Sequence, residues 1–136
     1  AALNNYSMID AGSPVMPPPS FFNPEIAHGF CYYFEQADLA RQLGDWSRVA
    51  SLGDIAFHLN DYPNDPVERF VFIEGYAHEG EWNQVKDLAL TSYKVSPPYV
   101  GPLLCKLLAR IDRDVPPSAV EQSSLNELNT KFSCLP

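Results

Sequence analysis

The chain has 136 residues and a formal net charge of −8, which is enough sequence for one domain with a single core. Eleven acidic and four basic residues lie between Glu35 and Asp87, and this excess of negative charge argues against nucleic acid as a partner. No apolar run reaches the roughly 18 residues of a membrane span, and no basic-then-apolar leader is present. The sequence does not begin with Met, so we expect it to be part of a longer protein.

Residues 1–24 are predicted to form a proline-rich arm or linker. The stretch SPVMPPPSFFNP has no helical period, and its prolines favour extended or polyproline backbone. Phe21 and Phe22 are too apolar for a free linker. We therefore expect the end of the arm to pack against the first helix or against a neighbouring domain.

A helical period begins near Glu25 and predicts the first of two antiparallel helices. Gly44 ends this helix with a tight turn, and Asp45 is placed to cap the next one. The small residues Ala37 and Ala40 allow the two helices to approach closely. The predicted apolar positions are Phe30, Tyr33, Phe34, Ala37, Ala40 and Leu43 on the first helix, and Trp46, Val49, Ala50, Leu52, Ala56 and Leu59 on the second.

A second pair of helices is predicted after the loop NDYPNDP. The stretch Asp65–Glu68 is a helix start, with an Asp cap, Pro at the first helical position and Glu three residues after the cap. Gly80 ends this third helix, and Trp82 opens a fourth, which Pro97–Pro98 closes. The predicted apolar positions are Val67, Phe70, Val71, Ile73, Tyr76 and Ala77 on the third helix, and Val85, Leu88, Ala89 and Tyr93 on the fourth.

A third pair follows. Its first helix is predicted over about Val100 to Arg110, with Lys106 and Arg110 on the outer side, and its second helix begins near Pro117–Ser118. Two of the cysteines, Cys31 and Cys105, lie in apolar helical surroundings, where a small buried side chain is the expected role. The sequence leaves open whether any cysteines pair.

The two glycine turns are copies of one motif. LGDWSRV at 43–49 and EGEWNQV at 79–85 share a glycine, an acid, a tryptophan and a valine, displaced by 36 residues. A period in the middle thirties with two helices per unit is typical of a helical solenoid, in which neighbouring units bury a continuous core. The same period reaches Ser118, so we expect a third, degenerate unit. The predicted helical domain covers residues 25–136, with repeats at about 27–62, 63–98 and 99–134.

At these residues the chain resembles the tetratricopeptide repeat family. Gly44, Trp46, Gly80 and Trp82 stand where that family has its glycine–acid–aromatic turn, and Pro97 stands where the family closes a repeat. The resemblance implies an all-α fold, a right-handed superhelix of about six helices arranged in antiparallel pairs. The units of this chain, at 36 residues, are longer than the usual length of about 34 in that family.

A looser resemblance concerns two longer stretches. FFNPEIAHGFCYYFEQADLARQLGDW and LNDYPNDPVERFVFIEGYAHEGEW look like the C-terminal tail of large bacterial polytopic membrane proteins related to lipid-dependent glycosyltransferases. This resemblance implies a soluble domain tethered to a bacterial cell membrane through upstream sequence, and it implies no chemistry in the tail itself. It leaves the side of the membrane open.

The first helices of the two clear repeats carry the candidate binding residues. In the tetratricopeptide repeat family these helices line the concave face, and in this chain that face mixes aromatic anchors with negative charge. Such a surface favours an extended or helical segment that carries Lys or Arg. The alternative is an acidic face that is only solvated and has no ligand. The candidates are Phe34, Asp38, Arg41, Phe70, Glu74 and His78.

Trp46 and Trp82 are predicted to pack between helices, because an aromatic residue that recurs beside a turn is usually part of the core. The alternative is that their faces are exposed and stack on sugar. That arrangement would suit an accessory domain that orients the substrate of a membrane glycosyltransferase.

The sequence predicts neither a metal site nor a catalytic site. Glu74 and His78 share a helical face but supply only two ligands. The loop at Asp61–Asp65 lacks the glycine and the distal glutamate of a calcium loop. No serine–histidine–acid order, nucleophile elbow or phosphate loop is present.

We therefore predict a chain that is not an enzyme and needs no cofactor. Its predicted function is that of a non-catalytic protein–protein interaction or scaffolding module. The predicted partner is a protein or peptide segment, for which basic residues are favoured, or the parent protein itself. Nucleic-acid binding and direct membrane insertion are not predicted.

Overall fold

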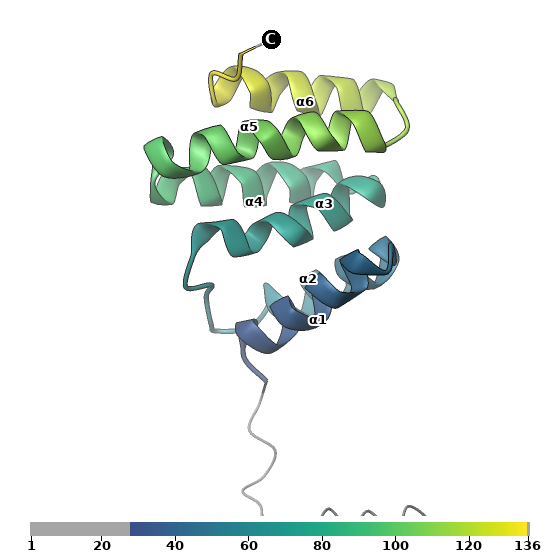
Figure 1. The fold of residues 1–136 in the computed structure, drawn as a ribbon, viewed down its shortest axis with the longest axis vertical. Helices are drawn as coiled ribbons and strands as arrows, with labels where there is room; N and C mark the ends of the chain where they lie inside the picture. The colour runs from purple at the N-terminus through teal and green to yellow at the C-terminus, as the bar shows by residue number, and fades with distance from the viewer. Residues whose placement is uncertain (1–27, 136) are drawn as a thin grey trace, which may run out of the picture.

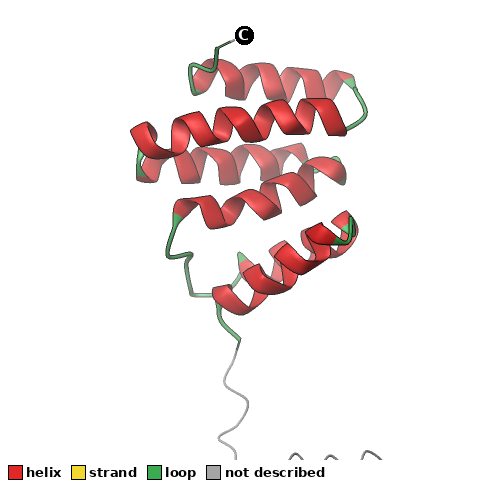
Figure 2. Cartoon of the chain, viewed as in Figure 1, coloured by secondary structure: helices red, strands yellow, loops and turns green. Residues whose placement is uncertain are grey.

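The computed structural model describes residues 28–135, so the predicted arm at 1–24 lies outside the described part. Within that part, every regular element is a helix (Figure 2). No helix of residues 28–135 has the length and apolar character needed to cross a bilayer. The six α-helices and one short 3-10 helix are α1 (Phe30–Gln42), α2 (Trp46–Ala56), η2 (Pro66–Arg69), α3 (Phe70–His78), α4 (Trp82–Val95), α5 (Pro97–Asp114) and α6 (Ala119–Lys131).

The helices are stacked in chain order, from the purple α1 at one end to the yellow α6 at the other (Figure 1). Consecutive helices contact each other, and α3 also contacts α1, α5 also contacts α3, and α6 also contacts α4. Each helix from α3 onwards therefore packs on earlier helices. The prediction of an all-α fold with six helices is confirmed for the described residues.

The turn that repeats in the sequence also repeats in the structure. Gly44 and Gly80 have φ values of 72° and 76°, in the left-handed region that glycine adopts without steric cost. After each glycine, the backbone N–H of the acidic residue donates to a carbonyl five residues back: Asp45 to Ala40 and Glu81 to Tyr76, both at 2.9 Å. The tryptophan then begins the next helix in both copies.

The core runs between the helices and includes most of the predicted apolar positions. Ala37 and Ala40 are buried, as expected for a close approach of α1 and α2. The helices α2 and α3 also approach closely, because a Cβ at Gly75 would lie 2.3 Å from a methyl carbon of Val49. Leu43 differs from the prediction: it ends α1 and is 76% exposed.

Two helix starts depend on capping side chains. The Asp65 carboxylate accepts from the N–H of Val67 at 3.0 Å, as the predicted helix start requires, and it opens η2 ahead of α3. At α6, Ser118 and Glu121 form a reciprocal capping box, with N–H···O distances of 3.1 and 3.2 Å.

The start of α5 corrects a prediction. Pro97–Pro98 does not close α4; it forms the first turn of α5, which runs from Pro97 to Asp114 instead of from Val100 to Arg110. Proline is tolerated there because the first N–H groups of a helix have no partner within the helix. Ser96, between the two helices, has a non-helical backbone with φ of −159° and ψ of 85°.

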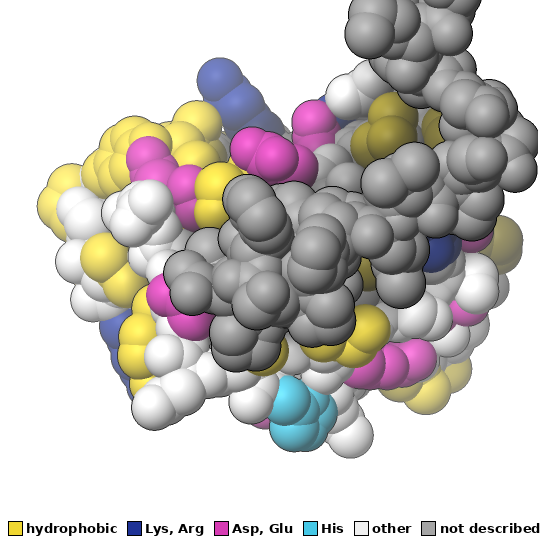
Figure 3. Space-filling model, turned by 90° about the horizontal axis from the view of Figure 1, so that it is seen from below, with side chains coloured by type: hydrophobic (Ala, Val, Ile, Leu, Met, Phe, Trp, Pro, Cys, Tyr) yellow, Lys and Arg dark blue, Asp and Glu magenta, His cyan; other side chains and the backbone are white. Residues whose placement is uncertain are grey.

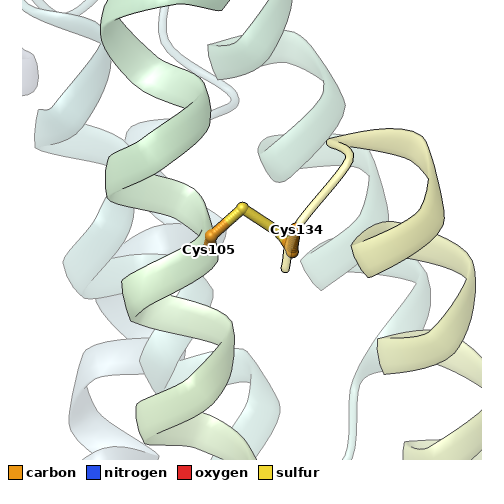
Figure 4. Close-up of a disulfide and its surroundings, with 2 residues drawn as sticks. All are labelled: Cys105 and Cys134. Atoms are coloured by element: carbon orange, nitrogen blue, oxygen red, sulfur yellow. A yellow bond between two sulfur atoms is a disulfide. The ribbon is translucent and has the colours of Figure 1, made fainter. Parts of the chain in front are cut away.

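The cysteines also correct the prediction of small buried side chains. Cys31 is exposed. Cys105 is joined by a disulfide to Cys134, which is 29 residues later and lies beyond the end of α6 (Figure 4). Between α6 and Cys134, Ser133 has φ of 54°, a left-handed conformation that is unusual for a residue other than glycine. The disulfide therefore fastens the end of the chain to the middle of α5.

Candidate functional site

The structure places the six predicted groove residues on α1 and α3, which contact each other. Phe34 and Phe70, the predicted aromatic anchors, are half-buried and pack against the core. Each therefore keeps only part of its ring available to a ligand. The four other residues are polar, and their partners decide what charge the face presents.

The carboxylate of Asp38 is shared by two neighbours on α1. Arg41 reaches Asp38 Oδ1 with its Nη2 atom at 3.1 Å, and Gln42 donates to Oδ2 at 3.2 Å. Asp38 and Arg41 are both about 40% exposed, at 41% and 39%. The negative charge that the sequence predicts at this position is therefore compensated within the same helix.

Glu74 does not present a free carboxylate in an open groove, and this part of the prediction is wrong. Its side chain is only 5% exposed and forms a two-bond pair with Arg110, at 2.9 and 3.0 Å. Burial of a carboxylate is costly unless it is paired and hydrogen-bonded. Arg110 provides this pairing from α5, so the ion pair joins α3 to α5. The sequence predicts only that Arg110 lies on the outer side of its helix.

The repeat period contains the signal for this pair. Asp38, Glu74 and Arg110 are spaced by 36 residues, so they occupy the same position in successive units. Equivalent positions on stacked units are neighbours. An acid at one such position and an arginine at the next therefore indicate an ion pair between units, which a search for local motifs does not find.

His78 lies flat on Trp46, the first residue of α2. The two rings are 4.1 Å apart at their centroids and inclined by 3°. Nε2 of His78 is buried without a hydrogen-bond partner among the described residues. Burial lowers the pKa of His78 below its ordinary value of 6.5, and the nearby carboxylates, Glu74 first, oppose this shift. His78 is therefore a packing residue on α3 whose protonation is disfavoured.

The tryptophans lie mainly among other side chains. Trp82 is buried, with 6% of its surface exposed. Trp46 is half-buried, and His78 covers one of its faces. Gly44 and Gly80 form the turns that precede the two tryptophans. The described environment is that of residues that hold successive helices together.

A pocket between η2, α3 and α5 adds residues that the sequence prediction missed. It has a volume of about 320 Å³ and a mainly apolar lining. Phe70 is the one predicted groove residue in its wall. The complete lining consists of Val67, Phe70, Tyr99, Leu103, Lys106, Leu107 and Arg110. We call it the α3–α5 pocket.

The rim of the α3–α5 pocket is basic. Lys106 is exposed and has no ion-pair partner among residues 28–135, whereas Arg110 is already paired with Glu74. Tyr99 is half-exposed and its hydroxyl donates to Asp65 at 3.3 Å. The pocket therefore combines an apolar floor with one uncompensated positive charge.

A second apolar pocket, of about 470 Å³, lies beside the disulfide. Its wall includes Tyr93, Pro97, Phe132 and Leu135, together with both disulfide-bonded cysteines. Lys106 borders this pocket as well as the α3–α5 pocket. The exposed side of α5 is thus flanked by two apolar hollows.

The described residues offer no arrangement for metal chemistry. No group of three or more His, Cys, Asp and Glu side chains in residues 28–135 is placed to hold a metal ion. Glu74 and His78, which share a face of α3, are engaged with Arg110 and with Trp46 respectively. The candidate site is therefore an apolar contact surface that carries both paired and unpaired charges.

Comparisons with protein-family models, with curated proteins and with solved structures found no match. The likeness to tetratricopeptide repeats therefore rests on the residues of the turn and on the period of this chain.

Proposed function

We propose that this chain is a non-catalytic protein-interaction module, built as a tetratricopeptide-like right-handed superhelix, and that it binds a peptide segment of another protein or of its parent. The observation that carries the proposal is the α3–α5 pocket. Its apolar lining and volume of about 320 Å³ suit one large apolar side chain. Its position between the first helices of successive pairs supports a role as part of a longer groove.

The charges around the pocket change the expected partner. The carboxylates of Asp38 and Glu74, which argued for a basic segment, are paired with Arg41 and Arg110. Of the two charged residues in the pocket lining, Arg110 is paired with Glu74, and Lys106 has no ion-pair partner among residues 28–135. We therefore propose a segment with a Leu, Phe or Trp anchor and an adjacent Asp or Glu, because such a segment complements both features.

A sugar-binding role receives no support from the tryptophans. Stacking on sugar requires an open aromatic face, but Trp82 is buried and one face of Trp46 is covered by His78. Attachment to a membrane protein remains a proposal that rests on the looser sequence resemblance.

The test is fluorescence polarisation with labelled peptides that carry a central Leu or Phe flanked by Asp and Glu, by Lys and Arg, or by Ser. We expect the acidic set to bind best, with an affinity that falls as salt is raised. Lys106→Glu should remove the acidic preference, and Leu103→Ser should weaken all three sets because it lines the pocket. Lys94→Glu makes the same charge change at an exposed position of α4 and should have no effect.

Equal binding of all three peptide sets would contradict the proposed chemistry. If the protein prefers the basic peptides and keeps this preference after Lys106→Glu, the binding site is the predicted acidic face of α1 and α3. Loss of binding in the Lys94→Glu control would show that the effect comes from overall charge and not from the α3–α5 pocket.

A further inference from the structure

The outer side of α1 carries an apolar stripe that the described chain leaves uncovered. Tyr32, Leu39 and Leu43 are 39%, 53% and 76% exposed. They are separated by seven and four residues, a spacing that places them on one side of a helix. We call this surface the α1 stripe. It lies on the first helix of the stack, at the end where the chain enters (Figure 1).

The repeat shows what this side of the helix does elsewhere. In α3, the corresponding side packs onto the preceding pair of helices. Phe72 is fully buried against Phe30 and Phe57, with ring centroids 5.8 and 5.1 Å away. Gly75, the residue 36 positions after Leu39, lies so close to Val49 that no side chain fits. The position of Leu39 is therefore a docking position in the next unit.

The third unit uses the same side at two of these positions. Leu108 and Ile111 follow the positions of Phe72 and Gly75 by 36 residues, and both are buried. Val115 is buried as well, whereas its equivalent in the second unit, Glu79, is exposed. In α1 alone among the three first helices, this side has no earlier helix of the described chain to contact. The α1 stripe thus corresponds to a surface that is covered in the later units but is exposed in the described chain.

The other end of the described stack has polar residues at the equivalent positions. Asp54 and Phe57 of α2 face α3, and the residues 72 positions later on α6 are the polar Asn126 and Asn129. The disulfide from Cys105 also holds the end of the chain beside them. A polar outer face is typical of a terminal repeat that receives no further helix. At these positions the C-terminal face of the described stack is therefore more polar than the α1 stripe.

The chain itself approaches the N-terminal end of the described stack along the α1 stripe. His28, the first described residue, stacks on Tyr32 with ring centroids 3.7 Å apart and an inclination of 10°. At the first residue of α1, the backbone N–H of Phe30 donates to the carboxylate of Asp61 at 2.7 Å, which fixes the start of the helix. The sequence upstream of His28 therefore begins at the first residue of the stripe.

We propose that the α1 stripe is the docking site of the upstream segment of the same chain, residues 15–27, with Phe21 and Phe22 as its apolar anchors. The eleven residue steps from Tyr32 to Leu43 span about 17 Å at 1.5 Å per step. About five extended residues cover that distance. Phe22 precedes His28 by six residues, so its side chain is within reach of the whole stripe.

The charges favour this occupant over a second copy. Residues 30–56 carry four acidic and two basic side chains, so two copies joined through this end would bring like charges together. Residues 1–27 contain only two charged side chains, Asp10 and Glu25. Figure 3, which views the molecule from this end, shows Asp and Glu side chains interspersed with hydrophobic ones.

The test uses the full chain with Phe22→p-benzoylphenylalanine, a photo-crosslinking residue, irradiated at high dilution and mapped by mass spectrometry. We expect crosslinks within one chain, concentrated on the peptide that contains α1. Leu39→Asp should reduce their yield by about tenfold, the change expected when about 1.4 kcal/mol of apolar contact is lost. Val95→Asp introduces the same change at a similarly exposed position of α4 and should leave the yield unaltered.

Crosslinks scattered over the surface, or an equal loss with Leu39→Asp and Val95→Asp, would overturn the proposal. Crosslinks that join α1 to another chain at high dilution would also overturn it and would assign the stripe to a second copy. The α1 stripe and the α3–α5 pocket share no residue. Peptide binding to the pocket can therefore fail without affecting this result, and the reverse is also true.

Discussion

At the scale of single residues, His78 couples the packing of α3 to pH. Its Nε2 atom is buried without a partner in the described chain, and burial lowers its pKa below 6.5. The folded state therefore binds this proton less readily than the unfolded state. Stability gained from the neutral ring is complete above pH 6.5, and it is lost as the pH falls below 6.5 towards the folded-state pKa.

We expect the free energy of urea unfolding to fall between about pH 7.5 and about pH 5, and His78→Gln to reduce this pH-dependent loss. For each protein, the quantity to compare is the change in unfolding free energy between the two pH values. The free energy at one pH is not sufficient, because the substitution also removes the stack on Trp46. His58→Gln, at an exposed site in the turn after α2, provides the control. An identical pH dependence in all three proteins would show that His78 is protonated as easily in the folded state as in the unfolded state.

The pairing of Glu74 with Arg110 shows that the acidic composition does not give the charge of the surface directly. An acid that is 5% exposed and bound by a guanidinium adds to the formal charge count but presents no negative charge to a ligand. Exposed acids such as Glu79 and Glu81 still contribute to the field around the molecule. Net charge thus predicts long-range behaviour better than it predicts the chemistry of one groove.

At the scale of helices, each tryptophan begins the second helix of a pair but is buried to a different extent. Trp82 is 6% exposed, whereas Trp46 is half-buried under His78. We expect Trp82→Ala to lower the free energy of unfolding by about 3 to 5 kcal/mol, as for other buried aromatic truncations, and Trp46→Ala to lower it by less.

Urea unfolding followed by circular dichroism measures both changes. Tyr62→Ala, which shortens an exposed aromatic residue, should alter the free energy by less than either. Effects of Trp46→Ala that equal or exceed those of Trp82→Ala would mean that the stack with His78 contributes more than burial does.

The elements that could be predicted from the sequence depend on local chemistry. Gly44 and Gly80 mark turns because they adopt positive φ, and Asp65 marks a helix start because its carboxylate accepts from the next turn. Pro97 is locally ambiguous, since proline both follows helix ends and occupies first turns. The structure resolves this ambiguity in favour of a helix start.

The features that escaped prediction depend on contacts between elements. Leu43 is exposed at the C-cap of α1, and its equivalent 36 residues later, Glu79, is exposed at the C-cap of α3. The bond between Cys105 and Cys134, and the α3–α5 pocket, each require the relative placement of separate helices. All six predicted groove residues lie on the helices predicted to carry them, but the pairing of their charges and the α5 wall of the α3–α5 pocket were not predicted.

At the scale of the whole molecule, the Cys105–Cys134 disulfide closes a loop in the C-terminal quarter of the chain. A sequence separation of 29 corresponds to a stabilisation of about 3 to 4 kcal/mol when loop closure restricts the unfolded chain. We expect reduction, or the double substitution Cys105→Ser and Cys134→Ser, to lower the unfolding free energy by that amount. Cys31→Ser removes the exposed thiol and serves as the control. A loss confined to the control would contradict the pairing.

The same disulfide also bears on the redox environment of the protein. Such bonds form and persist in oxidising surroundings and are rare where glutathione and thioredoxin keep thiols reduced. In the membrane-tethered arrangement that we propose, we therefore expect the domain to lie on the side of the membrane away from the cytoplasm. Protein taken from its native host and alkylated before any reduction should carry the label on Cys31 alone; label on Cys105 or Cys134 would place the domain on the cytoplasmic side instead.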